Sequence, residues 1–162
     1  MPGTGKSTVG VILAKLLGYS FTDTDILISS SRGATLPQLI EKLGWEGLIK
    51  IEGETGERLE CSSTVIATGG SMVFSAGAMR HLKTSGVTVW LKTPLEVLTR
   101  RLSAGLESRG VAAPAGTTLE QLAAKREPYY GMYADYAVNC AADADSTAQL
   151  IAQLLRENGF FD

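Results

Sequence analysis

The sequence predicts an α/β fold, in which helices cover both faces of a parallel sheet. Short β-branched and aromatic runs alternate with amphipathic segments along the chain, and such alternation is the pattern of βα units. With 162 residues, 44% of them hydrophobic, the chain can bury one sizeable core. The sequence has no internal repeat and no linker, so we expect a single domain over residues 1–162.

The first residues, Met-Pro-Gly-Thr-Gly-Lys-Ser-Thr, match the end of the phosphate-binding motif G-x-x-x-x-G-K-[ST], the P-loop. Gly3 and Gly5 would let backbone N–H groups turn toward phosphate oxygens, in a conformation that a Cβ atom would obstruct. Lys6 would reach the β- and γ-phosphates, and the Ser7 hydroxyl would ligate Mg²⁺. A glycine-rich turn that only opens a helix is the alternative. The predicted nucleotide-binding residues of this motif are Gly3, Thr4, Gly5, Lys6, Ser7 and Thr8.

An amphipathic helix follows this motif. Apolar residues recur from Val9 to Leu17 at helical spacing, and Gly18 stands where a left-handed C-terminal residue is expected. The positive end of the helix would face the bound phosphates. A P-loop normally follows a buried parallel strand, but the first glycine of the motif would precede Met1 here. We therefore expect that the first, central strand of the sheet is missing from this sequence, which is a fragment or has its start placed too late.

Two acidic residues end the next predicted strand. Tyr19–Thr22 is a short extended run, and Asp23 and Asp25 after it would share one face of the segment. Both carboxylates could then point into a crevice beside the phosphates. Helix capping is the alternative, because Asp is favoured at the start of a helix, but capping accounts for only one of the two residues.

Residues 26–60 read as helical, with a break at Gly44. This stretch is longer than a plain crossover between strands, and we expect a helical insertion that holds the acceptor substrate. Ser63–Thr68 is a β-branched strand that leads into Gly69 and Gly70. The carboxyl ends of parallel strands are where ligands collect, so this glycine pair is a second candidate site feature, although it could also be only a turn.

Residues 103–117 are rich in Ser, Gly, Ala and Pro and contain a single arginine, Arg109. A loop of this length in a compact domain is usually a lid or disordered. Its arginine is either solvated or closes over a transferring phosphoryl group.

Composition excludes several classes of protein. The formal net charge is −2, so the chain lacks the basic footprint of a nucleic-acid-binding protein. It has no apolar run of about 18 residues that could span a membrane, and no signal peptide. Cys61 and Cys140 have no metal-ligand spacing, which fits a reduced cytoplasm. We expect a cytoplasmic monomer that binds neither nucleic acid nor membrane.

Together these segments resemble the shikimate kinases, a family with the P-loop fold of the nucleoside-monophosphate kinases. The resemblance runs from Gly3 to about Leu155. Many families share the P-loop, but the ordered set of motifs at these separations is much more specific. It consists of Gly-Thr-Gly-Lys-Ser-Thr, Phe21–Asp25, Ala67–Gly70, Ser108–Arg109 and Lys125–Tyr130.

The resemblance implies an ATP-dependent phosphotransferase that moves the γ-phosphoryl group to a hydroxyl of shikimate, with Mg²⁺ as cofactor. It implies that Lys6, Asp25 and Arg109 are catalytic, and that Asp25 binds the acceptor and orients or deprotonates its hydroxyl. It also implies a sheet with strand order 2-3-1-4-5. The remaining implied roles are Ser7 and Asp23 near Mg²⁺, Arg101 stacked on adenine, Gly69 and Gly70 against the acceptor or the γ-phosphate, and Arg126 on the acceptor carboxylate.

Three places depart from the family pattern. Ser71 stands where the family usually has a third glycine, and Gly110-Val111 follow the lid arginine where Pro-Leu is usual. Ile49 occupies the place of a second arginine that grips the substrate, and Lys50, about 100° further round the helix, would not point the same way. Loss of that charge-assisted bond costs about 1.5–3 kcal/mol. The alternatives are therefore a kinase for another polyol or sugar-acid acceptor, or a nucleotide-binding paralogue without turnover.

Overall fold

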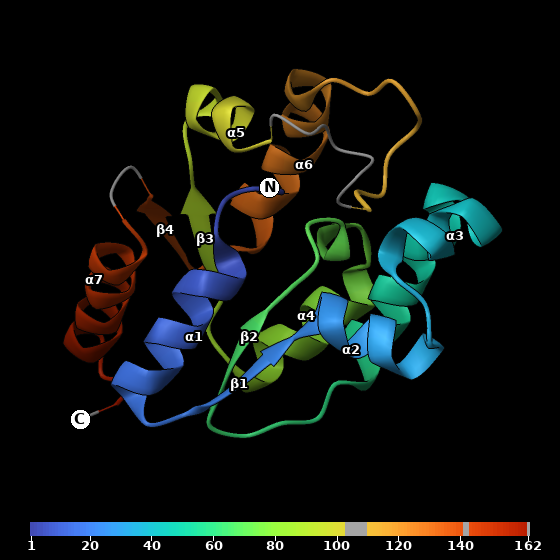
Figure 1. The fold of residues 1–162 in the computed structure, drawn as a ribbon. Coiled ribbons are helices and arrows are strands. Elements are labelled where there is room, and N and C mark those ends of the chain that lie inside the picture. Colours follow the sequence, from blue (N-terminus) through green and yellow to red (C-terminus); the bar gives the residue numbers. More distant parts are fainter. Residues whose placement is uncertain (103–109, 141–142, 162) are drawn as a thin grey trace.

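The computed structural model describes residues 1–102, 110–140 and 143–161, and Figure 1 shows how helices and parallel strands alternate along them. In chain order the elements are α1 (Lys6–Leu17), β1 (Ser20–Asp23), α2 (Thr24–Arg32), α3 (Leu36–Arg58), β2 (Thr64–Ala67), the 3₁₀ helix η1 (Met72–Phe74), α4 (Ala76–Ser85), β3 (Val89–Lys92), α5 (Leu95–Arg101), α6 (Leu119–Tyr133), β4 (Tyr136–Asn139) and α7 (Ala144–Glu157). This order confirms the predicted α/β class. The two helices α2 and α3 occupy the stretch where the sequence predicts a helical insertion.

Two glycines set the helix ends that the sequence indicates. Gly18 ends α1 in the left-handed conformation, with φ of 66°. Gly44 has φ of 74° and ψ of 168°, so it kinks α3 at the predicted break while the helix continues on both sides. Thr35 and Gln38 begin α3 with a capping box, in which each side chain accepts a hydrogen bond from the other residue's backbone N–H.

The strands pair in two parallel ribbons. β1 pairs with β2 so that Asp23 lies opposite Ala67, and β3 pairs with β4 so that Lys92 lies opposite Asn139. The carboxyl ends of β1 and β2 therefore lie side by side, and the acidic segment after β1 meets the glycine turn after β2. This arrangement builds one wall of the site described below.

An apolar cavity separates the two ribbons. Among the described residues, β2 and β3 do not pair with each other. Protein interiors contain few voids larger than a water molecule, yet this cavity has a volume of about 470 Å³. In the order 2-3-1-4-5 the missing strand counts as strand 1, so β1, β2, β3 and β4 are strands 2, 3, 4 and 5. Both observed pairs are those that this order requires on either side of its central strand, but the order itself stays a prediction. The side chains that line the cavity include Val9, Leu13, Val65, Ile66, Val89, Leu91 and Ile151.

The helices bury their apolar faces in separate core clusters around the strands. α1 and α7 share one cluster with β4, in which Val9, Val138 and Ile151 are buried. η1 and α4 form another, centred on Met72 and Met79 and covered by tyrosines of α6. Within the described parts of the chain, no helix is both long and apolar enough to cross a membrane.

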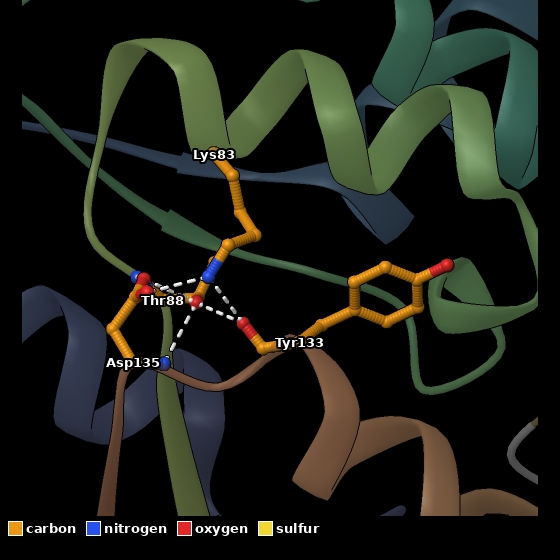
Figure 2. A network of polar contacts seen from close by, with 4 residues as sticks. All are labelled: Lys83, Thr88, Tyr133 and Asp135. Atoms are coloured by element: carbon orange, nitrogen blue, oxygen red, sulfur yellow. Dashed lines mark hydrogen bonds and ion pairs between the residues drawn. The ribbon is translucent and has the colours of Figure 1, made fainter.

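A polar network ties the start of β3 to the turn before β4 (Figure 2). The Lys83 ammonium of α4 donates to a carboxylate oxygen of Asp135 at 2.5 Å and to the carbonyl of Tyr133 at 2.8 Å. The other Asp135 oxygen accepts from the backbone N–H of Thr88 at 2.8 Å. Partial burial would raise the pKa of Asp135, but the hydrogen bonds from Lys83 and Thr88 hold it below its ordinary value. The network therefore joins the residues that immediately precede the two strands of this ribbon.

Candidate active site

The predicted P-loop forms an open turn at the start of α1. Gly3 and Gly5 have φ of 73° and 93°, in the left-handed region that favours glycine, as the motif predicts. Gly5 is the N-cap residue of α1, and no side chain caps this end of the helix. The N–H groups of the first turn and the positive end of the helix dipole are therefore available to a phosphate.

Lys6 and Thr4 both bind the backbone just before the P-loop glycines. The Lys6 ammonium donates to the carbonyl of Met1 at 3.0 Å, and the Thr4 hydroxyl donates to the same oxygen at 2.9 Å. Burial lowers the pKa of Lys6, Asp25 and Asp23 raise it, and the nearby charge of Arg126 lowers it further. The lysine thus lies among the acidic and basic groups of the site.

One cavity of about 620 Å³ extends from the P-loop to the carboxyl ends of β1 and β2. Two predicted site residues, Thr4 and Gly69, are buried and do not line this cavity. Arg109, with residues 103–109 of the predicted lid, lies outside the described residues. The predicted residues that line the cavity are Gly3, Gly5, Lys6, Ser7, Thr8, Asp23, Asp25, Gly70, Arg101 and Arg126.

Asp23 caps a helix and contacts the P-loop at the same time. One carboxylate oxygen accepts from the backbone N–H groups of Asp25 at 2.9 Å and Ile26 at 3.4 Å, which begins α2. The other accepts from the Ser7 hydroxyl at 2.5 Å. The capping alternative is therefore correct for Asp23, and it does not exclude the functional one.

Ser7 and Asp23 are suited to Mg²⁺, which commonly takes one or two protein oxygens and completes its shell with phosphate and water. Within the described residues, no cluster of three or more His, Cys, Asp or Glu side chains could hold a metal by itself. The oxygen donors of Ser7 and Asp23 fit a metal that arrives with a nucleotide. They are less suited to a resident metal, which needs a larger set of protein ligands.

Asp25 presents a buried carboxylate oxygen that lacks a partner. Its Oδ1 atom is buried and has no hydrogen bond within the described residues. Burial raises the pKa of Asp25, and the charge of Asp23 raises it further, whereas Lys6 and Arg126 lower it. A carboxyl group placed in this way can accept a hydrogen bond from a ligand hydroxyl, and it can take the proton of that hydroxyl.

Across the cavity from Asp25, Arg126 has a buried donor atom that lacks a hydrogen-bond partner. Only 2% of this residue is exposed. Its Nη2 atom donates to the carbonyl of Ala112 at 3.0 Å, and its Nε atom is buried without a hydrogen bond in the described part of the chain. Because a buried charged group with an unsatisfied donor is costly, the position is suited to an anionic ligand group.

The glycine pair after β2 has two different uses. The N–H of Gly69 donates to the Thr24 hydroxyl at 2.9 Å, which joins the turn to the start of α2. Gly70 lines the cavity, and its carbonyl accepts from the Tyr130 hydroxyl at 2.7 Å. A Cβ atom on Gly70 would lie 2.5 Å from Nη1 of Arg126, so a larger residue here would require the guanidinium to shift. Contact of either glycine with an acceptor stays a prediction.

Arg101 extends from the end of α5 onto the P-loop. Its Nη1 atom donates to the carbonyl oxygens of Gly3 at 3.2 Å and Thr4 at 3.3 Å. The side chain thus lines the nucleotide end of the cavity. A guanidinium at this place can cover the face of a bound base.

Ile49, the departure in α3, and its neighbour Lys50 have distinct surroundings. Ile49 is half-buried against the apolar cluster that contains Ile28 and Leu48, so its side chain packs into the protein. Lys50 is 79% exposed and lies 4.0 Å from Glu54 one turn further along the helix, so it does not replace a buried arginine.

Sequence reasoning missed Glu52 as a residue of this cavity. Glu52 is buried on the face of α3 that carries Leu48 and Ile51, and its carboxylate accepts from the Ser71 hydroxyl at 2.6 Å. The available signal was an acidic residue at i+4 from a buried leucine, which places a charge on the apolar face of a helix. Its partner Ser71 was singled out only because the family usually has a third glycine at that position.

These groups define a class of protein. A P-loop with its lysine, a Ser–Asp pair suited to Mg²⁺, and a cavity that ends in a buried carboxylate and a buried guanidinium are the parts of a phosphotransferase. Its acceptor is a small molecule that carries a hydroxyl and an anionic group.

Comparison with known proteins identifies the family. Residues 2–157 match the model of the shikimate kinase family, and the chain belongs to that family. It is 39% identical to a shikimate kinase of Synechococcus sp. (strain RCC307) over 160 residues, which cover 95% of this chain and 80% of that protein. It is 34% identical to shikimate kinase 2 of Sodalis glossinidius, with 94% and 90% covered. Shikimate kinases are phosphotransferases with an alcohol acceptor.

The fold comparison agrees with the sequence comparison. The structure of shikimate kinase from Acinetobacter baumannii in complex with shikimate matches with a TM-score of 0.85 and 34% identity. The match covers 98% of this chain and 90% of that one. A shikimate kinase from Bacteroides thetaiotaomicron matches with a TM-score of 0.80 and 27% identity, and 96% and 94% of the two chains are covered.

Proposed function

We propose that this protein transfers the γ-phosphoryl group of Mg-ATP to a hydroxyl of shikimate, which gives shikimate 3-phosphate and ADP. The observation that carries this proposal is a pair of buried polar atoms without partners, Oδ1 of Asp25 and Nε of Arg126. Both belong to residues that line the cavity beginning at the P-loop. A hydroxy acid supplies a hydroxyl donor for the first atom and a carboxylate for the second. Membership of the shikimate kinase family supports the same reaction.

Mg-ATP supplies the phosphoryl group and part of the charge neutralisation. The first turn of α1 and Lys6 hold the phosphates, Ser7 and Asp23 supply oxygens to the metal, and Arg101 covers the base. Asp25 holds the acceptor hydroxyl and takes its proton, while Arg126 fixes the acceptor by its carboxylate. Catalysis is then mainly positioning and electrostatic stabilisation, to which we assign Arg109 as the closing group.

Ile49 supports a second candidate, a kinase for another polyol or sugar-acid acceptor. Its apolar side chain packs against α2 and α3 where the family usually has a second substrate-gripping arginine. Lys50 is exposed and does not replace the missing charge. An acceptor that needs less cationic binding than shikimate would be preferred under this alternative.

A coupled assay of ADP release with Mg-ATP, with and without shikimate, tests the proposed function. Shikimate-dependent release that disappears in Lys6→Ala establishes it, since Lys6 lies on the surface of the cavity and its loss should leave folding intact. ATP binding without release on shikimate, but with release on another hydroxy acid, favours the second candidate. ATP binding without transfer to any acceptor indicates a paralogue without turnover.

We also propose that the complete sheet has the order 2-3-1-4-5, with one further parallel strand between β2 and β3. The apolar cavity between the two ribbons supports this order, and so does the parallel direction of both pairs. The P-loop lies at one end of this cavity, where a strand that precedes it would end.

A further inference from the structure

Glu52 is a buried carboxylic acid to which the proposed reaction gives no role. It lies on α3, and only 3% of the residue is exposed. Its side chain nevertheless lines the same cavity as Asp25 and Arg126. Because a buried carboxyl group is costly unless it is neutral or well partnered, its contacts indicate what it does there.

The turn after β2 holds the Glu52 carboxyl from two sides. The Ser71 hydroxyl, itself buried, donates to Oε2 of Glu52 at 2.6 Å. Gly69 lets the carboxyl pack directly on the backbone, since a Cβ atom there would lie 2.7 Å from Cδ of Glu52. The orientation of the carboxyl at the cavity wall is therefore fixed by residues on both sides of Gly70.

Charged groups from three helices face Glu52: Lys6 from α1, Asp25 from α2 and Arg126 from α6. None of the salt bridges in the described part of the chain involves Glu52. Burial raises the pKa of Glu52 to about 7, against the hydrogen bonds from Ser71 and the charge of Arg126, which lower it. The charge of Asp25 raises it further, so this carboxyl changes its charge near neutral pH.

We propose that Glu52, positioned by Ser71, determines acceptor specificity by hydrogen bonding to a hydroxyl of the acceptor and disfavouring a second anionic group beside it. The inference rests on the proposed function, because it needs the acceptor to occupy this cavity. The favoured class is a polyhydroxylated acid with one carboxylate. The acceptor carboxylate binds Arg126. A second carboxylate would face the carboxyl groups of Glu52 and Asp25, and position 49, where the family usually has an arginine, is an isoleucine here.

Steady-state kinetics across neutral pH test this proposal with Glu52→Gln and Ser71→Ala. In wild type, kcat/KM for shikimate should change through an inflection near pH 7. Glu52→Gln should remove the inflection, because the amide does not titrate. Ser71→Ala should move it to higher pH, because a hydrogen bond that favours the charged carboxyl is lost. Both variants should raise the KM for shikimate about tenfold and leave the KM for ATP unchanged.

The chain offers a matched control. Ser75 donates to Glu57 at 3.0 Å, which is a second serine–glutamate pair between the same two segments, but exposed and away from the cavity. Glu57→Gln should keep the wild-type inflection and both KM values. The proposal is overturned if Glu52→Gln keeps the inflection, or if the KM for ATP rises together with the KM for shikimate.

A binding experiment separates this inference from the proposed function. With ¹³C-labelled glutamate, the Glu52 carboxyl resonance is the one that Glu52→Gln removes, and its titration is followed with and without shikimate. If wild type binds shikimate without releasing ADP, the proposed function fails, and movement of this resonance on binding still supports the inference. Binding without movement of the resonance overturns the inference alone, and absence of shikimate binding overturns both.

Discussion

The hydroxyl of Ser7 donates to a carboxylate oxygen of Asp23 at 2.5 Å, which joins the P-loop to the end of β1. The second oxygen of the same carboxylate caps α2. One side chain thus positions a candidate metal ligand and starts the helix that carries Asp25. Because the two contacts use different oxygens, they can be separated by mutation.

Asp23→Asn should lower turnover about 10- to 100-fold and leave stability nearly unchanged. Asn caps helices as well as Asp does, but it lacks the charge that a Mg²⁺ ligand needs. The loss corresponds to one charge-assisted interaction of about 1.5–3 kcal/mol. Mg²⁺ titrations of the rate and urea unfolding measure the two effects.

Asp23→Ala is the comparison for that variant. It should lose the same activity and, in addition, about 1 kcal/mol of stability through loss of the cap. If Asp23→Asn keeps the wild-type Mg²⁺ dependence, Asp23 is only a capping residue.

Arg126→Lys should raise the KM for shikimate at least about tenfold and leave the KM for ATP unchanged. Lysine keeps the charge, but it lacks the planar fork and the Nε donor, which is buried without a partner in Arg126. Lys125→Met, a change at the exposed neighbour, is the control and should have wild-type constants. Equal effects of Arg126→Lys on both KM values would contradict the assignment of this residue to the acceptor.

The parts of the site that the sequence predicted are local in the chain. The P-loop glycines, Lys6 and the pair Asp23 and Asp25 follow from short spacings, and the structure brings all of them to one cavity. Arg109 lies outside the described residues. Residue types at fixed offsets are sufficient here, because the same few residues make the turn and the contact.

The parts that the sequence did not predict depend on long-range packing. Thr24 stands between the two predicted acids, and its hydroxyl binds Gly69 across 45 residues of sequence. Glu52 meets Ser71 across 19 residues. Neither pair has a local signature, because which face of α2 or α3 meets the glycine turn is decided by the packing of helices against β2. A missing central strand was expected from the P-loop motif and stays a prediction, whereas the apolar cavity between β2 and β3 was found only in the structure.

Asp25→Asn should make the protein more stable at neutral pH while it removes most of the activity. The raised pKa of Asp25, caused first by burial and then by Asp23, means that this carboxyl stabilises the fold below its unfolded-state pKa. That contribution is lost as the pH rises through the folded-state pKa. Asparagine does not ionise, so urea unfolding should show a gain of about 1 kcal/mol at neutral pH and little gain in acid. A variant that is less stable at neutral pH would contradict this reading of the site.

Asp135→Asn should destabilise the protein by about 1 kcal/mol at neutral pH, a figure that allows for solvent screening of this partly exposed group. The lowered pKa of Asp135 gives the opposite sign to that of Asp25. Its contribution is present above the unfolded-state pKa and is lost as the pH falls through the folded-state pKa. Unfolding curves at neutral and acidic pH should therefore converge for wild type and variant. Glu41→Gln, on an exposed position of α3, should change neither curve.

An apolar strand added before Met1 should fill the cavity between β2 and β3 and stabilise the protein by at least about 3 kcal/mol, the cost of one large cavity. Met1 is buried at the end of this cavity. Burial lowers the pKa of its amino group, and the charges of Lys6 and Arg126 lower it further. A peptide bond at this nitrogen removes the charge, so an attached strand relieves that cost as well as the void.

The strongest control for that extension is the same segment with a proline at its centre, which removes a backbone donor and cannot pair on both sides in the middle of a sheet. Urea unfolding compares the stabilities, and hydrogen exchange compares the amides of β2 and β3. Only the extension without proline should slow exchange in both strands, because both of their open edges would then be hydrogen-bonded. Equal stabilisation by the two extensions would mean that apolar cover, rather than a paired central strand, is what the cavity requires.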